Sequence, residues 1–327
     1  MALKKRDGYS QQSRNWLIQK AQTEELTPYE DTVSDEPLLS SLPKAGSIVS
    51  EIDDSNWDAK LLTLSNGVKV VLKNTDFKAD EIQMKGVSFG GSSLFPNSEI
   101  ININVLDEVV GVGGLGNFSK IDLEKVLAGK RASVSSFIGD KTEGVTGFCS
   151  PQDFETLMQL TYLTFTQPRK DIEAFNSYKK RTEAVLRNQE MHPTSALIDT
   201  LQQAIYMSHP RTKRIKADDI SKIDYDKVLE MYNDRFKDAS DFTFFFVGNI
   251  DIDSVKPLIT QYLGALPAIQ RKETFKDNGL KARQGMYENV FIKEQETPKS
   301  TVFLYYNGKC SYTLKNKLLL SVTDQIL

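Results

Sequence analysis

The most constraining stretch of this sequence is residues 241–247, which read DFTFFFV. Consecutive phenylalanines beside threonine and valine favour an extended strand. Successive side chains of a strand point to opposite faces of a sheet. Because this stretch is apolar at almost every position, it is too apolar for an exposed strand. We therefore expect residues 241–247 to form a central strand of a sheet.

Other segments supply further strands for this sheet. Residues 61–75, LLTLSNGVKVVLKNT, place Asn66-Gly67 between two β-rich runs, which predicts a hairpin with a type I′ turn. Residues 81–89 alternate in polarity and predict a third strand. Residues 131–137 and 143–150 alternate around a Gly-Asp pair and predict a second hairpin.

Helical periodicity fills most of the remaining chain. Ser119 with Asp122, and Ser150-Pro151 with Asp153, are typical of helix starts. Apolar residues at helical spacing predict helices in the segments 98–110, 119–128, 150–168, 172–186, 193–205, 224–236 and 251–264. The strands and helices do not alternate regularly, so the fold class is α+β, with a largely antiparallel sheet packed against helices.

Composition excludes several function classes. Lys+Arg 41 against Asp+Glu 44 gives a net charge of −3, which offers no field to attract nucleic acid or an anionic membrane. The basic run at residues 209–216 is followed by two aspartates, and we expect a solvated loop. Cys149 and Cys310 are too few for a disulfide scaffold or a thiolate zinc site. No apolar run reaches membrane-spanning length, and the first residues lack the apolar core of a secretory signal.

Changes in composition along the chain predict four regions. A proline-punctuated polar region carries a short helix around residues 16–26, and the last region combines strands at 290–292 and 301–305 with a helix at 314–327. The expected regions are a linker at 1–56, an α+β domain at 57–268, a second linker at 269–285, and the beginning of a second, similar domain at 286–327.

The candidate site lies in residues 101–116. If this segment is helical, Asn104, Asp107 and Glu108 stand at i, i+3 and i+4 and project from one face. On a catalytic zinc helix, two histidines and a general-base glutamate occupy such positions. This segment contains no histidine. A solvated helix face is therefore the simpler interpretation of its two carboxylates.

Two other motifs give weaker signals. Residues 111–116, GVGGLG, match the GxGxxG pattern of dinucleotide-binding proteins, but a helical segment precedes them where that fingerprint needs a strand. A junction between two helices is favoured, and saturable NAD binding that is abolished by Gly113→Ala would indicate the alternative. His192 and His209 each precede a proline and have no histidine at i+4, so neither is expected to bind metal.

Four phrases occur in order and carry a family resemblance. They are LLTLSNGVKVVLKNTDFKADEIQMKGVSFGGSS, LEKVLAGKRASVSSFIGDKTEG, FETLMQLTYLTFTQPRKDIEAF and FFFVGNIDIDSVKPLITQYLGALP. Across residues 57–268 the chain resembles a domain of the pitrilysin/insulinase-type zinc metallopeptidases. The resemblance implies the fold of these metallopeptidases, which is shared with LuxS and the mitochondrial processing peptidase.

The resemblance also identifies the metal-site positions of this family. Its HxxEH motif falls on Asn104, Asp107 and Glu108, and its later glutamate ligand falls on Asn188. All of these positions differ from the motif, and two are amides that cannot supply the charge that zinc sites use. The resemblance therefore implies no catalytic residue, no metal ligand and no cofactor in this chain.

Members of this family have two homologous halves that enclose a peptide chamber, and commonly one half alone keeps the metal. We expect this chain to belong to the second, metal-less half of a bacterial zinc protease. Its partners would be the N-terminal catalytic half, which would hold zinc, and a peptide or unfolded polypeptide. The chain alone is expected to be inactive, and a periplasmic setting follows by analogy. The alternative is a non-enzymatic scaffold subunit of the same fold, which would lack HxxEH in both halves.

Overall fold

The computed structural model describes residues 16, 19, 36–294 and 299–326. The chain divides into two compact units, Met1–Asp35 and Glu36–Leu327. The first unit is described only at Trp16 and Gln19, which have helical backbone. The rest of the short helix expected near residues 16–26 lies outside the described residues. The sheet and the helices that pack on it belong to the second unit.

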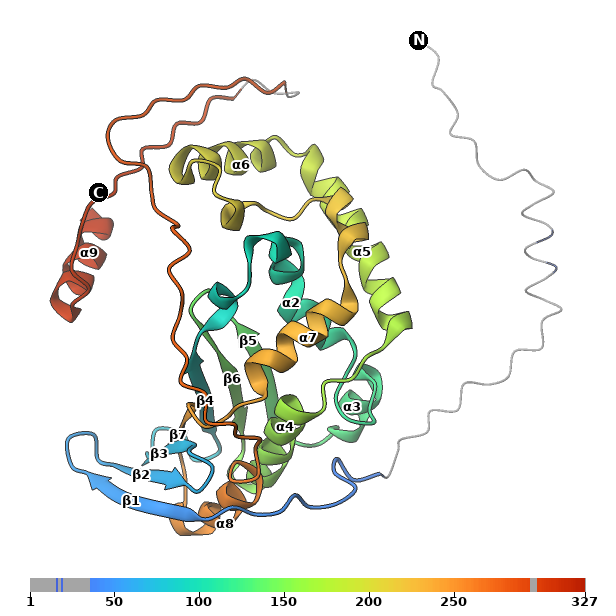
Figure 1. Ribbon diagram of the computed structural model, residues 1–327, viewed down its shortest axis with the longest axis vertical. Coiled ribbons are helices and arrows are strands. Elements are labelled where there is room, and N and C mark those ends of the chain that lie inside the picture. Colours follow the sequence, from blue (N-terminus) through green and yellow to red (C-terminus); the bar gives the residue numbers. More distant parts are fainter. Residues whose placement is uncertain (1–15, 17–18, 20–35, 295–298, 327) are drawn as a thin grey trace. The chain divides into compact units, whose positions relative to one another are not determined.

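Between residues 57 and 268, the strands and helices of the second unit follow the predicted order (Figure 1). The strands are β1 (Ile48–Asp54), β2 (Ala59–Leu64), β3 (Lys69–Asn74), β4 (Ile82–Phe89), β5 (Ala132–Ile138), β6 (Thr142–Cys149) and β7 (Thr243–Gly248). The helices are α2 (Ile100–Val112), α3 (Lys120–Val126), α4 (Phe154–Thr166), α5 (Ile172–Met191), α6 (Pro193–Tyr206), α7 (Tyr225–Phe236), α8 (Ile252–Tyr262) and α9 (Leu314–Ile326).

The described strands form one seven-stranded sheet in the order β1-β2-β3-β7-β4-β6-β5. β7 pairs in parallel with β3 and antiparallel with β4, which confirms the predicted central position of this strand. The other neighbouring pairs are antiparallel, so the α+β class with a largely antiparallel sheet is confirmed. Phe244 and Phe246 of β7 are fully buried. Burial of a phenylalanine side chain contributes roughly 1.5–3 kcal/mol.

The helices cover one face of this sheet. Figure 1 shows α2, α4 and α7 on the same side of the strands. Phe165 of α4 packs its ring against Phe236 at the end of α7, with 4.9 Å between ring centroids, and against Phe242 just before β7, with 5.0 Å. Edge-to-face aromatic pairs of this kind add to the stabilisation from burial. The core therefore lies between the sheet and this helical layer.

The hairpin predicted at Asn66-Gly67 is confirmed, but its turn type differs from the prediction. Gly67 donates its N–H to the Leu64 carbonyl at 2.9 Å, and residues 65–68 connect β2 to β3. Of these four residues Gly67 alone has a positive φ, 97°, whereas a type I′ turn needs two. The Asn66 amide donates instead to the carbonyls of Leu263 and Leu266, beyond α8. This tertiary contact holds the loop against the segment that follows α8.

β1 lies inside the range expected to be linker. Its sequence, IVSEIDD, is polar because it forms an edge of the sheet and pairs only with β2. Lys60 of β2 forms ion pairs with Glu51 and Asp53 of β1, each at 2.8 Å. Charged side chains are a common feature of edge strands, and they hide the strand from a hydrophobic-pattern prediction.

The second linker is held against the domain. Asp238 accepts backbone N–H groups from Ile269 and Arg271, Ser93 Oγ accepts the N–H of Lys276, and Arg283 donates to the Ile205 carbonyl. Residues 269–285, which the sequence predicts to be a linker, contain no helix or strand.

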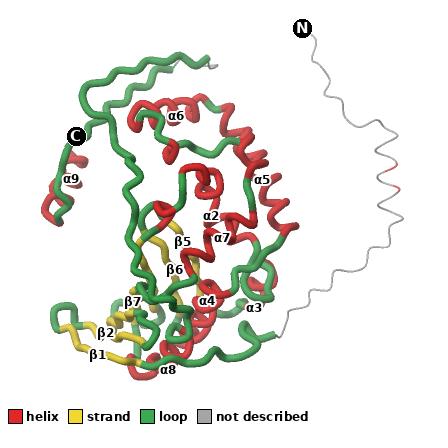
Figure 2. Tube along the Cα trace, in the orientation of Figure 1, coloured by secondary structure: helices red, strands yellow, loops and turns green. Residues whose placement is uncertain are grey.

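The strands expected at 290–292 and 301–305 are not formed. Figure 2 draws the described residues of this region as loop up to α9. Val290, Ile292 and Val302 are largely exposed. Two β-prone segments without a partner sheet are marginal in water, which gives the physical reason for the difference. The predicted helix at 314–327 is confirmed as α9.

Candidate functional site

The candidate site lies on the outer face of α2. The opposite face of this helix buries Val105, Leu106, Val109 and Val110 in the core. This apolar stripe fixes the rotation of the helix, so positions 104, 107 and 108 are exposed together. The predicted helix and the shared face of these three residues are confirmed.

Asp107 connects α2 to the edge strand β5. Its Oδ1 accepts the backbone N–H of Ile138, the last residue of β5, at 2.9 Å. Burial of part of the carboxyl group raises the pKa of Asp107, the bond from Ile138 lowers it, and the charge of Glu108 raises it. Because the residue as a whole is exposed, solvent screening keeps the energetic consequence small.

Glu108 connects α2 to α5. Its Oε2 accepts a hydrogen bond from the hydroxyl of Tyr178, which is buried, at 2.8 Å. Burial, and then the hydrogen bond to Glu108, raise the pKa of Tyr178. Tyr178 therefore remains a neutral donor, and Glu108 serves as an anchor for α5.

The two asparagines lie apart from each other. Asn104 donates its side-chain N–H to the Lys213 carbonyl at 3.0 Å, in the loop that carries the basic run 209–216. This loop is not simply solvated as expected, because the guanidinium of Arg211 is buried and donates to the carbonyls of Ser92 and Phe95. Asn188 is exposed on α5, and within the described residues no hydrogen bond joins it to the other three positions.

These residues do not fit a zinc ion. Asn104, Asp107 and Glu108 each have a protein partner, and Asn188 does not converge with them. Zinc sites use histidine, thiolate or carboxylate ligands in sets of three or four. In the part of the chain that the structure describes, no group of three or more such side chains is placed to hold a metal. The absence of a metal site stays a prediction of the sequence.

The glycine run after α2 forms a packed turn. Arg169 donates its N–H to the Gly114 carbonyl and Nη1 to the Gly113 carbonyl, while Gly116 donates its N–H to Gln167. A helix precedes these glycines and Ser119 caps α3 after them. The strand–turn–helix context of a dinucleotide fingerprint is therefore missing, which agrees with the predicted junction between helices.

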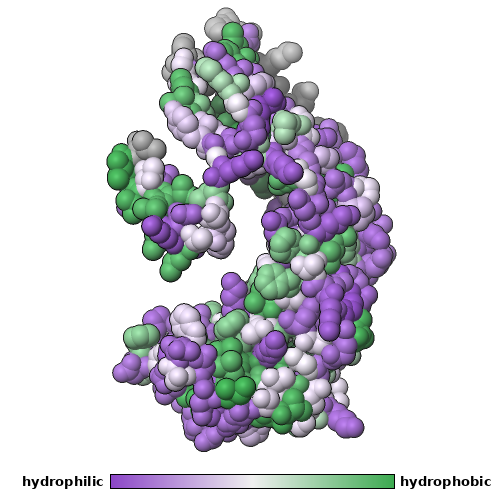
Figure 3. Space-filling model, turned by 60° about the vertical axis from the view of Figure 1, so that its left-hand side comes forward, coloured by the Kyte–Doolittle hydropathy of each residue, from purple (hydrophilic) through white to green (hydrophobic). Residues whose placement is uncertain are grey.

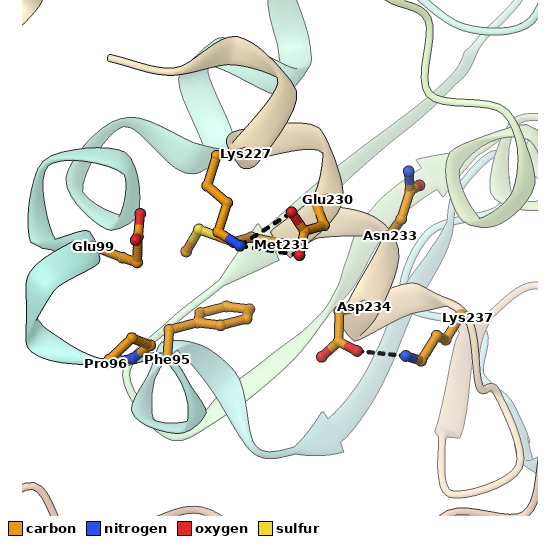
Figure 4. A pocket seen from close by; sticks show the side chains of 9 residues that line it. All are labelled: Phe95, Pro96, Glu99, Lys227, Glu230, Met231, Asn233, Asp234 and Lys237. Carbon is orange, nitrogen blue, oxygen red and sulfur yellow. Dashed lines mark hydrogen bonds and ion pairs between the residues drawn. The ribbon is translucent and has the colours of Figure 1, made fainter. Parts of the chain in front are cut away.

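A shallow pocket lies away from this site, between the segment before α2 and the outer face of α7 (Figure 4). Its volume is about 470 Å³. The lysines at its rim are paired with acids of the same helix, Lys227 with Glu230 and Lys237 with Asp234. Since these charges neutralise one another, the pocket offers shape but few free polar groups. It is lined by Phe95, Pro96, Glu99, Lys227, Glu230, Met231, Asn233, Asp234 and Lys237.

β5 contributes a feature that the sequence pattern did not reveal. Gly139 donates its N–H to Thr142, and Ser150 donates its N–H to the Arg131 carbonyl, so odd-numbered residues of β5 direct their backbone polar groups toward β6. The direction of the backbone N–H and C=O groups alternates along a strand. The backbone polar groups of even-numbered residues therefore point away from β6. Asp107 accepts the outward N–H of Ile138. Within the described residues, no hydrogen bond joins the N–H groups of Ala132, Val134 and Ser136 along this edge.

Comparison with known proteins gives this site a family context. A family model described as the Peptidase M16 inactive domain matches residues 222–327. A protein of Arabidopsis thaliana named zinc protease PQQL-like is 28% identical over 245 residues, which cover 74% of this chain and 23% of the relative. A probable zinc protease PqqL of Haemophilus influenzae is 23% identical over 288 residues, which cover 86% of this chain and 30% of the relative.

A solved structure shows the same fold. The crystal structure of the periplasmic protease PqqL from Escherichia coli matches with a TM-score of 0.65 at 21% identity, over 84% of this chain and 30% of that one. This chain thus spans between 23% and 30% of the length of these relatives. Among the described residues, no helix has the length and apolar character needed to cross a bilayer.

Proposed function

The chain is homologous to the PqqL-like zinc proteases of the M16 peptidase family, and from this relationship we propose that it forms a non-catalytic wall of a peptide-binding chamber. The other half of the parent protease would hold zinc and hydrolyse the bound polypeptide. A periplasmic setting belongs to the same proposal, because the relative from Escherichia coli is a periplasmic protease.

The observation that carries this proposal is the free edge of β5 beside α2. An extended peptide can add to such an edge through main-chain hydrogen bonds, which depend little on its sequence. The outward N–H groups of Ala132, Val134 and Ser136 supply donors at alternate residues. Asp107 occupies the last outward donor, at Ile138, and so defines where the available edge ends.

A single proline substitution tests this edge. Val134→Pro removes one outward N–H and keeps the ladder to β6, which proline tolerates at an edge. Val134→Ala is the matched control, since it shortens the same side chain but retains the N–H. We expect binding of a fluorescein-labelled unstructured 15-residue peptide, measured by anisotropy, to weaken at least tenfold for Val134→Pro and to change less than threefold for Val134→Ala.

Equal binding by the two variants, with circular dichroism showing both folded, would exclude the edge as the peptide site. The catalytic part of the proposal has a separate measurement. The purified chain is expected to leave a quenched fluorescent peptide intact and to contain no stoichiometric zinc in elemental analysis. One tight zinc per chain, or cleavage that is lost in Asp107→Ala and Glu108→Ala, would contradict the assignment of this chain to a non-catalytic role.

A further inference from the structure

Helix α6 is held by little apolar packing. Ser195 is its one buried residue, whereas α4 buries eight residues and α7 buries six. Its neighbours are α5 and the turn at Pro210–Thr212. In the middle of the helix, Asp199 pairs with Arg214 at 3.5 Å and with Lys216. Because most helical stability in proteins comes from a packed apolar face, α6 depends more on polar contacts than α4 or α7 does.

The backbone at the end of α6 is strained. Met207 and Ser208 follow the helix with φ values of 54° and 60°, in the left-handed region. This conformation is unfavourable for residues that carry a Cβ, and it recurs in segments that change conformation. At the other end, the non-helical residue His192 alone separates α6 from α5. Both ends of α6 are therefore candidate hinge positions.

Arg283 holds the C-terminal end of α6. Its backbone N–H donates to the Ile205 carbonyl at 2.7 Å, and its Nε donates to the Ala204 carbonyl at 2.8 Å. The last carbonyls of a helix have no partner within the helix and carry partial negative charge. A positively charged donor is therefore well suited to this position.

The segment that ends at Arg283 crosses the domain. We call residues 269–283 the strap, and Figure 1 shows it running from beyond α8 to the region of α6. Near its start, Glu273 Oε2 lies 3.0 Å from Nη1 of Arg235, whose side chain is buried at the end of α7. Farther along, Asn278 donates its Nδ2 to the Ser93 carbonyl at 3.0 Å. The strap thus connects α6 to the opposite end of the domain.

Polar bonds, more than apolar burial, hold the strap in place. Its large apolar side chains remain 39–57% exposed, and they are those of Ile269, Phe275 and Leu280. Figure 3 brings the strap side of Figure 1 forward, and many hydrophilic residues lie on the surface there. Segments with few buried apolar contacts open locally at a lower free energy than the core unfolds. The attachment of the strap is therefore a local equilibrium, separate from the stability of the sheet.

Arg283 also contacts the chain beyond the strap. Its guanidinium lies over the ring of Tyr287, 4.0 Å from the ring centroid, which is a cation–π contact. Its carbonyl accepts a hydrogen bond from Asn307 Nδ2 at 3.0 Å. One residue thus joins the end of α6 to two positions that follow the strap, so a shift of either position moves Arg283 relative to α6.

We propose that the strap is a conformational device in which Arg283 holds the C-terminal half of α6, and displacement of Tyr287 or Asn307 releases it. In the released form the bonds from Arg283 are broken and residues 200–208 move, while Asp199 keeps the middle of the helix attached. The device lies apart from the edge of β5. The inference therefore goes beyond the proposed peptide-binding function and does not rest on it.

Amide hydrogen exchange of the whole chain, followed by mass spectrometry, tests the device. Arg283→Ala removes the Nε donor and the contact with Tyr287 but retains the backbone N–H. Lys281→Ala is the matched control, because it removes a cation from the same strap, where Lys281 is exposed and has no hydrogen bond or ion pair within the described residues. Tyr287→Ala tests the coupling, and the double variant with Arg283→Ala tests whether that coupling acts through Arg283.

We expect exchange in residues 200–206 to accelerate at least about tenfold in Arg283→Ala, because a charge-assisted hydrogen bond is lost, and less than about twofold in Lys281→Ala. Tyr287→Ala should accelerate the same amides at least about threefold through the loss of the cation–π contact. The double variant should match Arg283→Ala alone, since the two changes remove one shared contact. Exchange in α4 should stay unchanged throughout.

Three outcomes would overturn the inference. The first is unchanged exchange of residues 200–206 in Arg283→Ala. The second is an equal acceleration in α4, which would show a loss of global stability in place of a local release. The third is a response to Tyr287→Ala that is absent, or that persists undiminished when Arg283 is already alanine, because either result would separate Tyr287 from α6.

Discussion

Two glycines at the end of α2 provide a sharp test of how this chain is packed. Gly113 has helical backbone with φ −77°, so alanine meets no backbone restriction there. A Cβ added at Gly113 would nevertheless lie 1.8 Å from the carbonyl oxygen of Arg169 and 3.0 Å from the hydroxyl of Tyr225. At Gly111, two residues earlier in the chain, an added Cβ meets nothing within 4 Å. The two sites differ in surroundings and share the same helix.

The expected magnitudes follow from these distances. To make room at Gly113, the Arg169 backbone must retreat by more than about 1 Å, and overpacking of this kind costs about 1–3 kcal/mol. The movement also breaks the bonds from Arg169 to the Gly113 and Gly114 carbonyls, which contribute about 0.5–1.5 kcal/mol each. We therefore expect Gly113→Ala to lower the free energy of unfolding by about 2–6 kcal/mol. Gly111→Ala should raise it by about 0.5–1 kcal/mol through helix propensity.

Urea denaturation followed by circular dichroism measures both changes. Wild type, Gly111→Ala and Gly113→Ala are compared at one pH, with midpoints interpreted only if the three slopes agree. If Gly113→Ala unfolds at the same urea concentration as Gly111→Ala, the close packing of the glycine turn against Arg169 is refuted. Because the assay contains no nucleotide, a loss of stability in Gly113→Ala would show a packing role for this glycine that does not depend on dinucleotide binding.

Two further predictions concern buried ionisable groups. Burial raises the pKa of Glu143, against the bond from Gly91 and the charge of Arg235. The folded state therefore binds the proton more tightly than the unfolded chain. The stability of the wild type relative to Glu143→Gln should fall as the pH rises from the ordinary glutamate pKa through the raised pKa of Glu143. Urea midpoints of the two proteins that move in parallel from pH 4 to 7 would contradict this. Burial also raises the pKa of Cys149 to about 12. With a thiol-reactive dye, exposed Cys310 should react at once and Cys149 only on unfolding, and two fast thiols would contradict that packing.

Local pattern was sufficient to predict most elements of this fold. The central position of β7 followed from its phenylalanines, and the helix start at Ser119 followed from capping chemistry, which the structure confirms. Pattern did not reveal that β7 separates β3 from β4, because strand order depends on contacts between residues far apart in the chain. β1 was missed for a different reason, since its polar edge sequence lacks the apolar alternation that marks a half-buried strand.

The candidate site was predicted in part for similar reasons. Helical spacing placed Asn104, Asp107 and Glu108 on one face, and the structure agrees. The partners of these side chains could not be predicted, because Asp107 meets Ile138 and Glu108 meets Tyr178 only after α2, β5 and α5 have packed together. The available N–H groups of β5 were hidden too, since backbone direction is known only once the register with β6 is known.

The contacts of Asp107 and Glu108 show how α2 is held in the domain. In the zinc motif, position 108 would hold a metal ligand and position 107 the general base, and a bound metal ties its ligand helix to its surroundings. In this chain Asp107 holds the end of β5 through Ile138, and Glu108 holds α5 through Tyr178. Each bond joins α2 to a separate element, so together they tie this helix to β5 and α5 without a metal. The two carboxylates therefore have structural roles that need no metal, and the same bonds keep the edge of β5 in place beside α2.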